Sequence, residues 1–116
     1  MLLLGIFVLF DLNFKINNVP KIVLLNNAES GITEFATPIE KIIAKMGSTS
    51  IFIEYTDCLT FNFDEVDGAI LTGSPQGDDI VEHHLPYFRW IQNFKQPLLG
   101  ICAGHHVTAF LNGADV

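Results

Sequence analysis

Cys102 is the residue of this 116-residue chain whose surroundings best suit a chemical reaction. It lies between Gly100 and Gly104, after an apolar run at residues 97–101 and before a helix-forming segment at residues 105–111. Glycines on both sides of a residue let a strand and the following helix pass closely, so the pattern predicts a nucleophile elbow, a sharp strand-to-helix turn. At a helix N-terminus, backbone N–H groups favour a thiolate over a thiol. The sequence therefore predicts a reactive thiol at Cys102.

The segments that would position this cysteine alternate between two periodicities. Short apolar or β-branched runs predict strands at residues 22–25, 51–55, 67–72 and 98–101, and patterns of helical spacing occupy residues 32–46 and 80–94. This alternation predicts an α/β domain with a mostly parallel sheet and helices on both faces, in three layers. Pro38 either kinks the first helix or restarts it behind a capping box at residues 37–40.

The second helical pattern predicts which side chains face the core. Leu85, Phe88 and Ile91, together with Trp90, fall on one side of a helix over residues 80–94. Pro86 fits only if the helix starts near it, because proline lacks the N–H that a helix interior needs.

Composition and charge restrict the class of protein. The chain is 49% hydrophobic and 16% charged, which is typical of one folded domain. Its net charge is −7 and its six lysines and arginines are scattered, so no basic surface is expected and nucleic acid is excluded as a partner. Two cysteines, Cys58 and Cys102, make no disulfide framework, and the sequence favours a reducing, cytoplasmic location. Cys58 has no glycine context and is interpreted as structural.

Residues 1–10 form an apolar run that precedes the domain. The run has about half the length needed to span a bilayer, and it lacks the basic start and the cleavage site of a secretory signal. The sequence therefore predicts no membrane partner. Residues 1–20 are interpreted as an apolar N-terminal extension and linker, and residues 21–116 as the domain.

Two motifs carry a resemblance to a known family. Residues 67–75 read Asp-Gly-Ala-Ile-Leu-Thr-Gly-Ser-Pro, and residues 97–105 read Pro-Leu-Leu-Gly-Ile-Cys-Ala-Gly-His. In this order they resemble the class I glutamine amidotransferases, most of all the glutaminase domain of GMP synthase and its relatives. The resemblance implies a flavodoxin-like fold, glutamine as substrate, and a partner that accepts ammonia, either a synthetase subunit or a synthetase domain.

The resemblance also assigns roles to residues. Cys102 would attack the side-chain amide of glutamine, which creates an oxyanion that needs aligned N–H donors. The N–H groups of Gly73 and Ala103 are the expected donors, because the carboxyl ends of parallel strands meet in one crevice. Ser74 and His106 are the expected substrate-binding residues. No cofactor is expected, since the chain has no Gly-x-Gly-x-x-Gly motif.

The sequence departs from the family pattern in two places. The family's histidine and acidic partner follow the cysteine at a distance, whereas only fourteen residues follow Cys102 and Asp115 is the only acid after Glu82. We therefore expect a domain truncated after the elbow helix, with an unpaired edge that promotes self-association. Histidine also replaces the family's usual glutamine at position 106.

Other interpretations of the same residues stay open. The chain is alternatively an inactive amidotransferase-like fragment or pseudoenzyme that folds without turnover. A second alternative is the intracellular peptidase and chaperone-like branch of the superfamily, which usually has histidine where this chain has Ala103. In a third alternative, Cys102 is a small buried hydrophobic residue without a chemical role. The pairs His83-His84 and His105-His106 lack a thiolate or carboxylate to complete a ligand set, so no metal is predicted.

Overall fold

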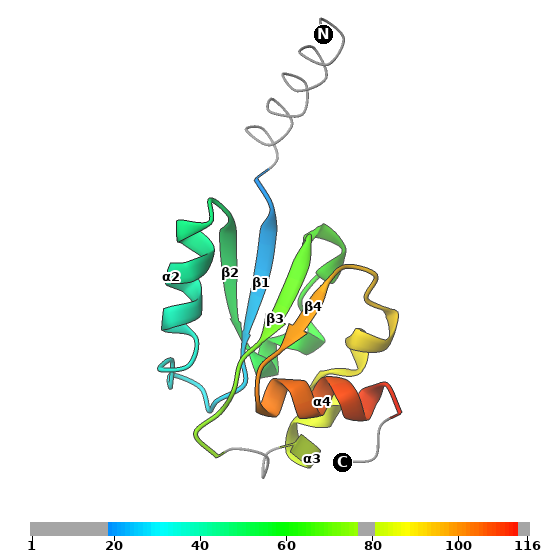
Figure 1. Ribbon diagram of the computed structural model, residues 1–116. Helices are drawn as coiled ribbons and strands as arrows, with labels where there is room; N and C mark the ends of the chain where they lie inside the picture. Colours follow the sequence, from blue (N-terminus) through cyan, green and yellow to red (C-terminus); the bar gives the residue numbers. More distant parts are fainter. Residues whose placement is uncertain (1–18, 77–80, 114–116) are drawn as a thin grey trace, which may run out of the picture.

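A parallel sheet organises the chain, and its strands end at one common edge. The computed structural model describes residues 19–76 and 81–113, and within them one four-stranded sheet has the order β2-β1-β3-β4 (Figure 1). The strands are β1 (Lys21–Asn26), β2 (Thr49–Glu54), β3 (Gly68–Leu71) and β4 (Leu98–Gly100). All pairings are parallel. This confirms the predicted α/β sheet, with every strand boundary within two residues of its predicted place.

β1 forms the centre of the sheet because its side chains are apolar on both faces. Val23, Leu24 and Leu25 are fully buried, and the strand pairs with β2 on one side and β3 on the other. A strand covered on both faces needs such a continuous apolar run, as the sequence indicated. The run ends in Asn26 and Asn27, which are also fully buried and lie at the carboxyl edge.

One face of the sheet is closed by helix α4 (Ala103–Leu111) and by short turns of helix. Val107 of α4 is fully buried in a core cluster with Leu25 and Leu71 from the strands and Phe88 and Ile91 from the turns. Aromatic rings surround this cluster, and Phe63 stacks on Trp90 with ring centres 3.8 Å apart. This face is the main hydrophobic core.

The other face is partly covered by α2 (Thr37–Lys45), which contributes the buried Ile43 (Figure 1). The predicted helix over residues 32–46 therefore starts later than the periodicity indicated, with Ala36 as its N-cap. Pro38 lies in the first turn of the helix, where a backbone N–H would have no partner within the helix, so its absence costs nothing. The predicted capping box is wrong, because the Thr37 hydroxyl donates to the Thr33 carbonyl at 3.0 Å and no side chain caps the helix.

The prediction of one helix over residues 80–94 is also wrong. The described part of that segment forms α3 (Val81–His84) and two 3₁₀ turns, η4 (Leu85–Tyr87) and η5 (Arg89–Asn93). Pro86 stands at the start of η4, because it cannot supply the N–H that a continuous helix would require there. The predicted core contacts hold nevertheless: Phe88 and Ile91 are buried, and Leu85 and Trp90 pack against them.

Several predicted features lie outside the described residues. These are the apolar extension at residues 1–10, most of its linker to residue 20, the end of the loop that begins at Gly73, and residues 114–116. In the part of the chain that the structure describes, no helix is both long and apolar enough to cross a bilayer.

Candidate active site

Cys102 occupies the turn between β4 and α4, and its backbone is strained. Its φ of 51° and ψ of −114° make it the only non-glycine residue with positive φ among residues 19–76 and 81–113. Such a conformation costs about 1–3 kcal/mol and persists only where the surrounding structure enforces it. The side chain is exposed, and Cys102 is the N-cap residue of α4. The predicted strand-to-helix elbow is confirmed.

The two flanking glycines enforce this turn by close backbone approach. A Cβ atom on Gly100 would lie 2.6 Å from the Gly104 carbonyl oxygen, and one on Gly104 would lie 2.5 Å from the Leu71 carbonyl oxygen. Both separations are shorter than real Cβ contacts, so no side chain fits at either position. The β4 backbone is fixed beside them, because the Ile101 N–H donates to the Leu71 carbonyl at 3.0 Å.

The loop after β3 brings Gly73 next to Cys102. A Cβ atom on Gly73 would lie 3.4 Å from the Cys102 Cβ and 3.8 Å from the Ile101 carbonyl oxygen. Ala103, the next residue of the elbow, is fully buried at the first turn of α4. The structure thus brings together the three residues predicted as nucleophile and N–H donors, at the carboxyl edge of the parallel strands.

The two predicted substrate-binding residues lie on the same two segments. Ser74 follows Gly73 and is buried, and its hydroxyl donates to the Gln76 Oε1 at 2.5 Å. His106 lies one turn into α4, where its backbone N–H donates to the Cys102 carbonyl at 3.1 Å. Its ring lies 5.8 Å from the exposed His105 ring, centre to centre.

A buried polar group at this edge was missed by sequence reasoning. His84 of α3 is only 2% exposed, and its Nδ1 lies 2.6 Å from the Asn27 Oδ1 at the end of β1. The ring stacks on Tyr55 at 3.8 Å between centres. Burial, and secondarily the neighbouring His83, lowers the pKa of His84 to about 4, so the ring is neutral at neutral pH. The signal available was the polar Asn26-Asn27 pair that ends an apolar strand.

The thiols differ sharply in environment. Cys58 in η1 (Tyr55–Leu59) is buried in the core, and this burial raises the pKa of its thiol to about 12. Cys102 is exposed at the elbow, and both cysteines are free. In the described part of the chain, no cluster of three or more His, Cys, Asp or Glu residues is arranged to hold a metal.

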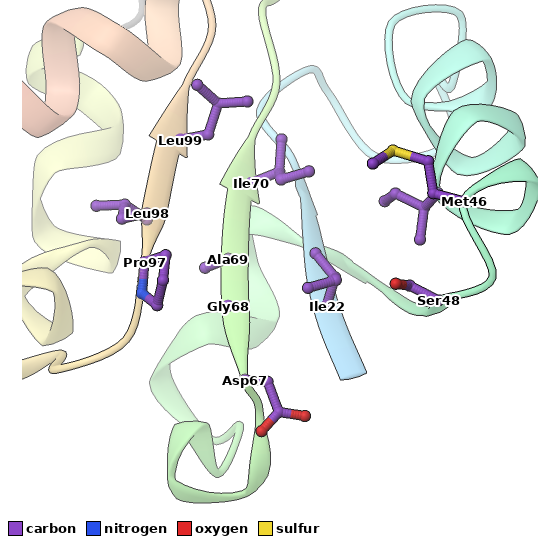
Figure 2. Close-up of a pocket in the computed structure, with 11 residues that line it drawn as sticks. Ile22, Met46, Ser48, Asp67, Gly68, Ala69, Ile70, Pro97, Leu98 and Leu99 are labelled. Atoms are coloured by element: carbon purple, nitrogen blue, oxygen red, sulfur yellow. The ribbon is translucent and has the colours of Figure 1, made fainter. Parts of the chain in front are cut away.

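An apolar groove of about 350 Å³ lies elsewhere, on the face of the sheet that α2 covers only in part. Figure 2 shows Ile22, Ile70 and Leu99 on that face, beside Met46. Leu99 and Met46 are 54% and 78% exposed. The lining includes Asp67, Gly68 and Pro97 from the amino ends of β3 and β4, and neither Gly73 nor Cys102. The groove therefore lies apart from the elbow, and the expected self-association through apolar surface stays a prediction.

The fold and the turn together define an α/β domain with a cysteine at a nucleophile elbow. Residues 21–116 match the family described as glutamine amidotransferase class-I. Over 60 residues the chain is 45% identical to the glutamine-hydrolyzing GMP synthase subunit of Ignicoccus hospitalis, a match that covers 52% of this chain and 27% of that protein. The chain belongs to the class I glutamine amidotransferase family.

A solved structure supports the fold assignment. The crystal structure of SMU.1228c matches with a TM-score of 0.56 and 20% sequence identity. The match covers 82% of this chain and 44% of that one. The chain thus spans less than half of the length of the known proteins it matches, and at this identity the likeness concerns the fold.

The close approach at the elbow generates a prediction for stability. We expect Gly104→Ala to lower the free energy of unfolding by roughly 2–3 kcal/mol or more, because the new methyl group would overlap the Leu71 carbonyl. Urea unfolding followed by circular dichroism measures the effect. The matched control is His105→Ala on the exposed next position of α4, expected to stay within about 0.5 kcal/mol of the wild type. Equal stability of the two variants would contradict the close packing.

The buried histidine generates a prediction for pH. The folded chain holds His84 neutral with a pKa of about 4, whereas the ordinary value in an unfolded chain is 6.5. Its contribution to stability is therefore complete above about pH 6.5 and declines as pH falls toward 4. Tyr55, which stacks on the ring, has its pKa raised by burial and stays uncharged in this range, and the neighbouring His83 adds to the effect of burial in lowering the pKa of His84.

The measurement is urea unfolding between pH 7.5 and pH 4.5. We expect His84→Phe, which keeps an aromatic ring beside Tyr55, to lose less stability over this interval than the wild type does. His105→Gln, on an exposed residue, is expected to keep the wild-type slope. If His84→Phe has the same pH slope as the wild type, His84 is not held neutral in the folded state.

Proposed function

We propose that this chain carries the glutamine-hydrolysing chemistry of a class I amidotransferase, with Cys102 as the nucleophile. The observation that carries the proposal is the strained, exposed Cys102 at the N-terminus of α4 with Gly73 beside it. Strain of this kind is retained at functional sites. Membership of the family supplies the substrate class, glutamine.

The first step is attack on the side-chain amide. The Cys102 thiolate adds to the amide carbon of glutamine, and the carbonyl electron pair moves onto oxygen to give a tetrahedral oxyanion. Collapse of this intermediate breaks the C–N bond, and the nitrogen leaves as ammonia after it takes up a proton. The product on the protein is a γ-glutamyl thioester. Water then cleaves the thioester, so that glutamine and water give glutamate and ammonia and the thiol is regenerated.

The oxyanion would be held by the N–H groups of Gly73 and Ala103. Both residues lie against Cys102, one across the crevice and one next in the chain. Fixed backbone donors in such a position contribute several kcal/mol to the transition state, because they need no rearrangement when charge develops. Ser74 and His106 lie on the same two segments, which supports their proposed role in contacts with bound glutamine.

Thioester hydrolysis also needs a base. In the family pattern that base is a histidine well downstream of the nucleophile, and the 116 residues hold only His105 and His106 after Cys102. Both lie on the helix that leaves the elbow, where a rigid backbone fixes their place relative to the thiol, so neither is expected to act as a direct in-line base. This observation favours a second candidate for the 116-residue polypeptide, in which acylation occurs without turnover. The peptidase branch gains no support, since the buried Ala103 stands where that branch has histidine.

An ammonia acceptor completes the proposal. The relative from Ignicoccus hospitalis is named as one subunit of a GMP synthase, so we propose that this chain likewise delivers ammonia to a synthetase domain or a synthetase subunit. The two free thiols suit the reducing cytoplasm in which we place the protein.

The first test compares the two thiols. With limiting iodoacetamide at neutral pH, we expect Cys102 to be alkylated at least about tenfold faster than Cys58, because one sulfur is exposed at a helix N-terminus and the other is buried with its pKa raised to about 12. Mass-spectrometric mapping of the labelled peptides measures the ratio. Preferential labelling of Cys58 would remove Cys102 from the role of nucleophile.

The second test separates acylation from turnover. The γ-(4-nitrophenyl) ester of N-acetylglutamate is expected to release about one equivalent of nitrophenol per chain, because an activated ester needs the thiolate and the donors but little help from an acid. Glutamine turnover by the 116-residue polypeptide is expected to be about 10²–10⁴-fold slower than that of an amidotransferase whose base is in place, the usual cost of a missing base. Cys102→Ala should abolish the nitrophenol burst. Glutamate release from glutamine at ordinary enzymatic rates would contradict this and assign a base within the 116 residues.

A further inference from the structure

A chain of buried hydrogen bonds connects α3 to the loop that carries Gly73. The His84 Nδ1 lies 2.6 Å from the Asn27 Oδ1, and the backbone N–H of Asn27 donates to the Thr72 hydroxyl at 3.0 Å. The Thr72 hydroxyl in turn donates to the Gly73 carbonyl at 2.9 Å. Asn27 and Thr72 are fully buried. Burying a polar group is costly unless it is hydrogen-bonded, so each of these groups depends on the next one for its hydrogen bond.

Thr72 fixes the backbone on both sides of Gly73. Its own N–H donates to the Leu25 carbonyl at 3.1 Å, which ties the end of β3 to β1. Its hydroxyl accepts from Asn27 and therefore directs its single proton toward the Gly73 carbonyl. The peptide N–H of Gly73 lies between these two anchored points. Gly73 has no side chain that could make contacts of its own, so the orientation of its peptide N–H depends on Thr72.

The side chain of Asn27, which anchors Thr72, has one paired polar atom and one unpaired polar atom. The Asn27 Nδ2 is buried and has no hydrogen-bond partner among the described residues. An unpaired buried amide costs about 1–3 kcal/mol. The Asn27 side chain is nevertheless kept in place by His84, whose ring is itself clamped by stacking on Tyr55.

We propose that Thr72 is the positioning residue for the Gly73 N–H, and that Asn27 and His84 form its buried anchor. The inference rests on the proposed function, in which Gly73 donates to the oxyanion. An oxyanion donor acts only if it is already aimed at the place where charge develops, and a displacement of about 1 Å costs on the order of 100-fold in rate. Thr72 touches no substrate in this scheme and acts through Gly73.

The test uses two reactions of Cys102 that differ in their need for an oxyanion donor. Iodoacetamide reacts by displacement at a saturated carbon and forms no tetrahedral oxyanion, whereas the γ-(4-nitrophenyl) ester of N-acetylglutamate does. Thr72→Val keeps the shape of the side chain and removes the hydroxyl. We expect it to slow acylation by the ester about 10- to 100-fold and to leave the iodoacetamide rate within about twofold of the wild type. Thr72→Ser, which restores the hydroxyl, should recover most of the ester rate.

Further variants complete the design. Thr60→Val removes an exposed hydroxyl bonded to the Asp57 carbonyl at 3.3 Å, remote from the elbow, and should change neither rate. His84→Phe should slow the ester reaction by a smaller factor, again with the iodoacetamide rate unchanged. If Thr72→Val does not fold, the His84→Phe variant tests the positioning role instead, because it leaves both Thr72 and Gly73 intact.

Each outcome has one meaning. A selective loss of the ester reaction in Thr72→Val or in His84→Phe supports the positioning role. Equal losses in both reactions overturn it in favour of a general structural role, and unchanged rates overturn it as well. If the wild type reacts with iodoacetamide but not with the ester, the proposed function fails and the positioning role falls with it.

Discussion

The close passage of α4 over the ends of β3 and β4 is the constraint on which the rest of this structure depends. Gly104 lies so near the Leu71 carbonyl, and Gly100 so near Gly104, that the connecting residues have one route between strand and helix. Cys102 takes the positive φ that this route demands. The strain is offset by burial further along, where Ala103 and Val107 are fully buried against the sheet.

The parallel sheet distributes polar and apolar groups unequally along its strands. The carboxyl ends gather the polar atoms, with Asn27 after β1, Thr72 after β3 and Cys102 after β4. The opposite ends of β3 and β4 border an apolar groove instead (Figure 2). Loops at the carboxyl ends of parallel strands meet in one crevice, so the topology explains why the elbow and the loop with Gly73 lie together. The size of the groove is no guide to the position of the site.

The sequence predicted those features that depend on neighbouring residues. Continuous apolar runs such as residues 22–25 predicted the strands, and the paired glycines around Cys102 predicted the elbow. The prediction of one helix over residues 80–94 was wrong. The apolar spacing fits a helix, but Pro86 and the packing of the aromatic core favour 3₁₀ turns there. The contact of His84 with Asn27 joins residues 57 positions apart, and no periodicity encodes it. Local pattern thus specified the elbow but not the buried network behind it.

The groups behind the elbow are all uncharged at neutral pH, and this has a physical reason. In the proposed mechanism, a positive charge close to Gly73 would act on the reacting atoms directly, whereas Asn27, Thr72 and a neutral His84 would act only through geometry. Burial keeps the pKa of His84 near 4, so the charge of its ring does not change across the neutral range. A charged residue in the same place would need a partner to repay its desolvation, and the described core offers none beside Phe88 and Tyr55. A neutral, hydrogen-bonded anchor therefore suits the proposed role of Thr72, which is to hold the Gly73 N–H in place.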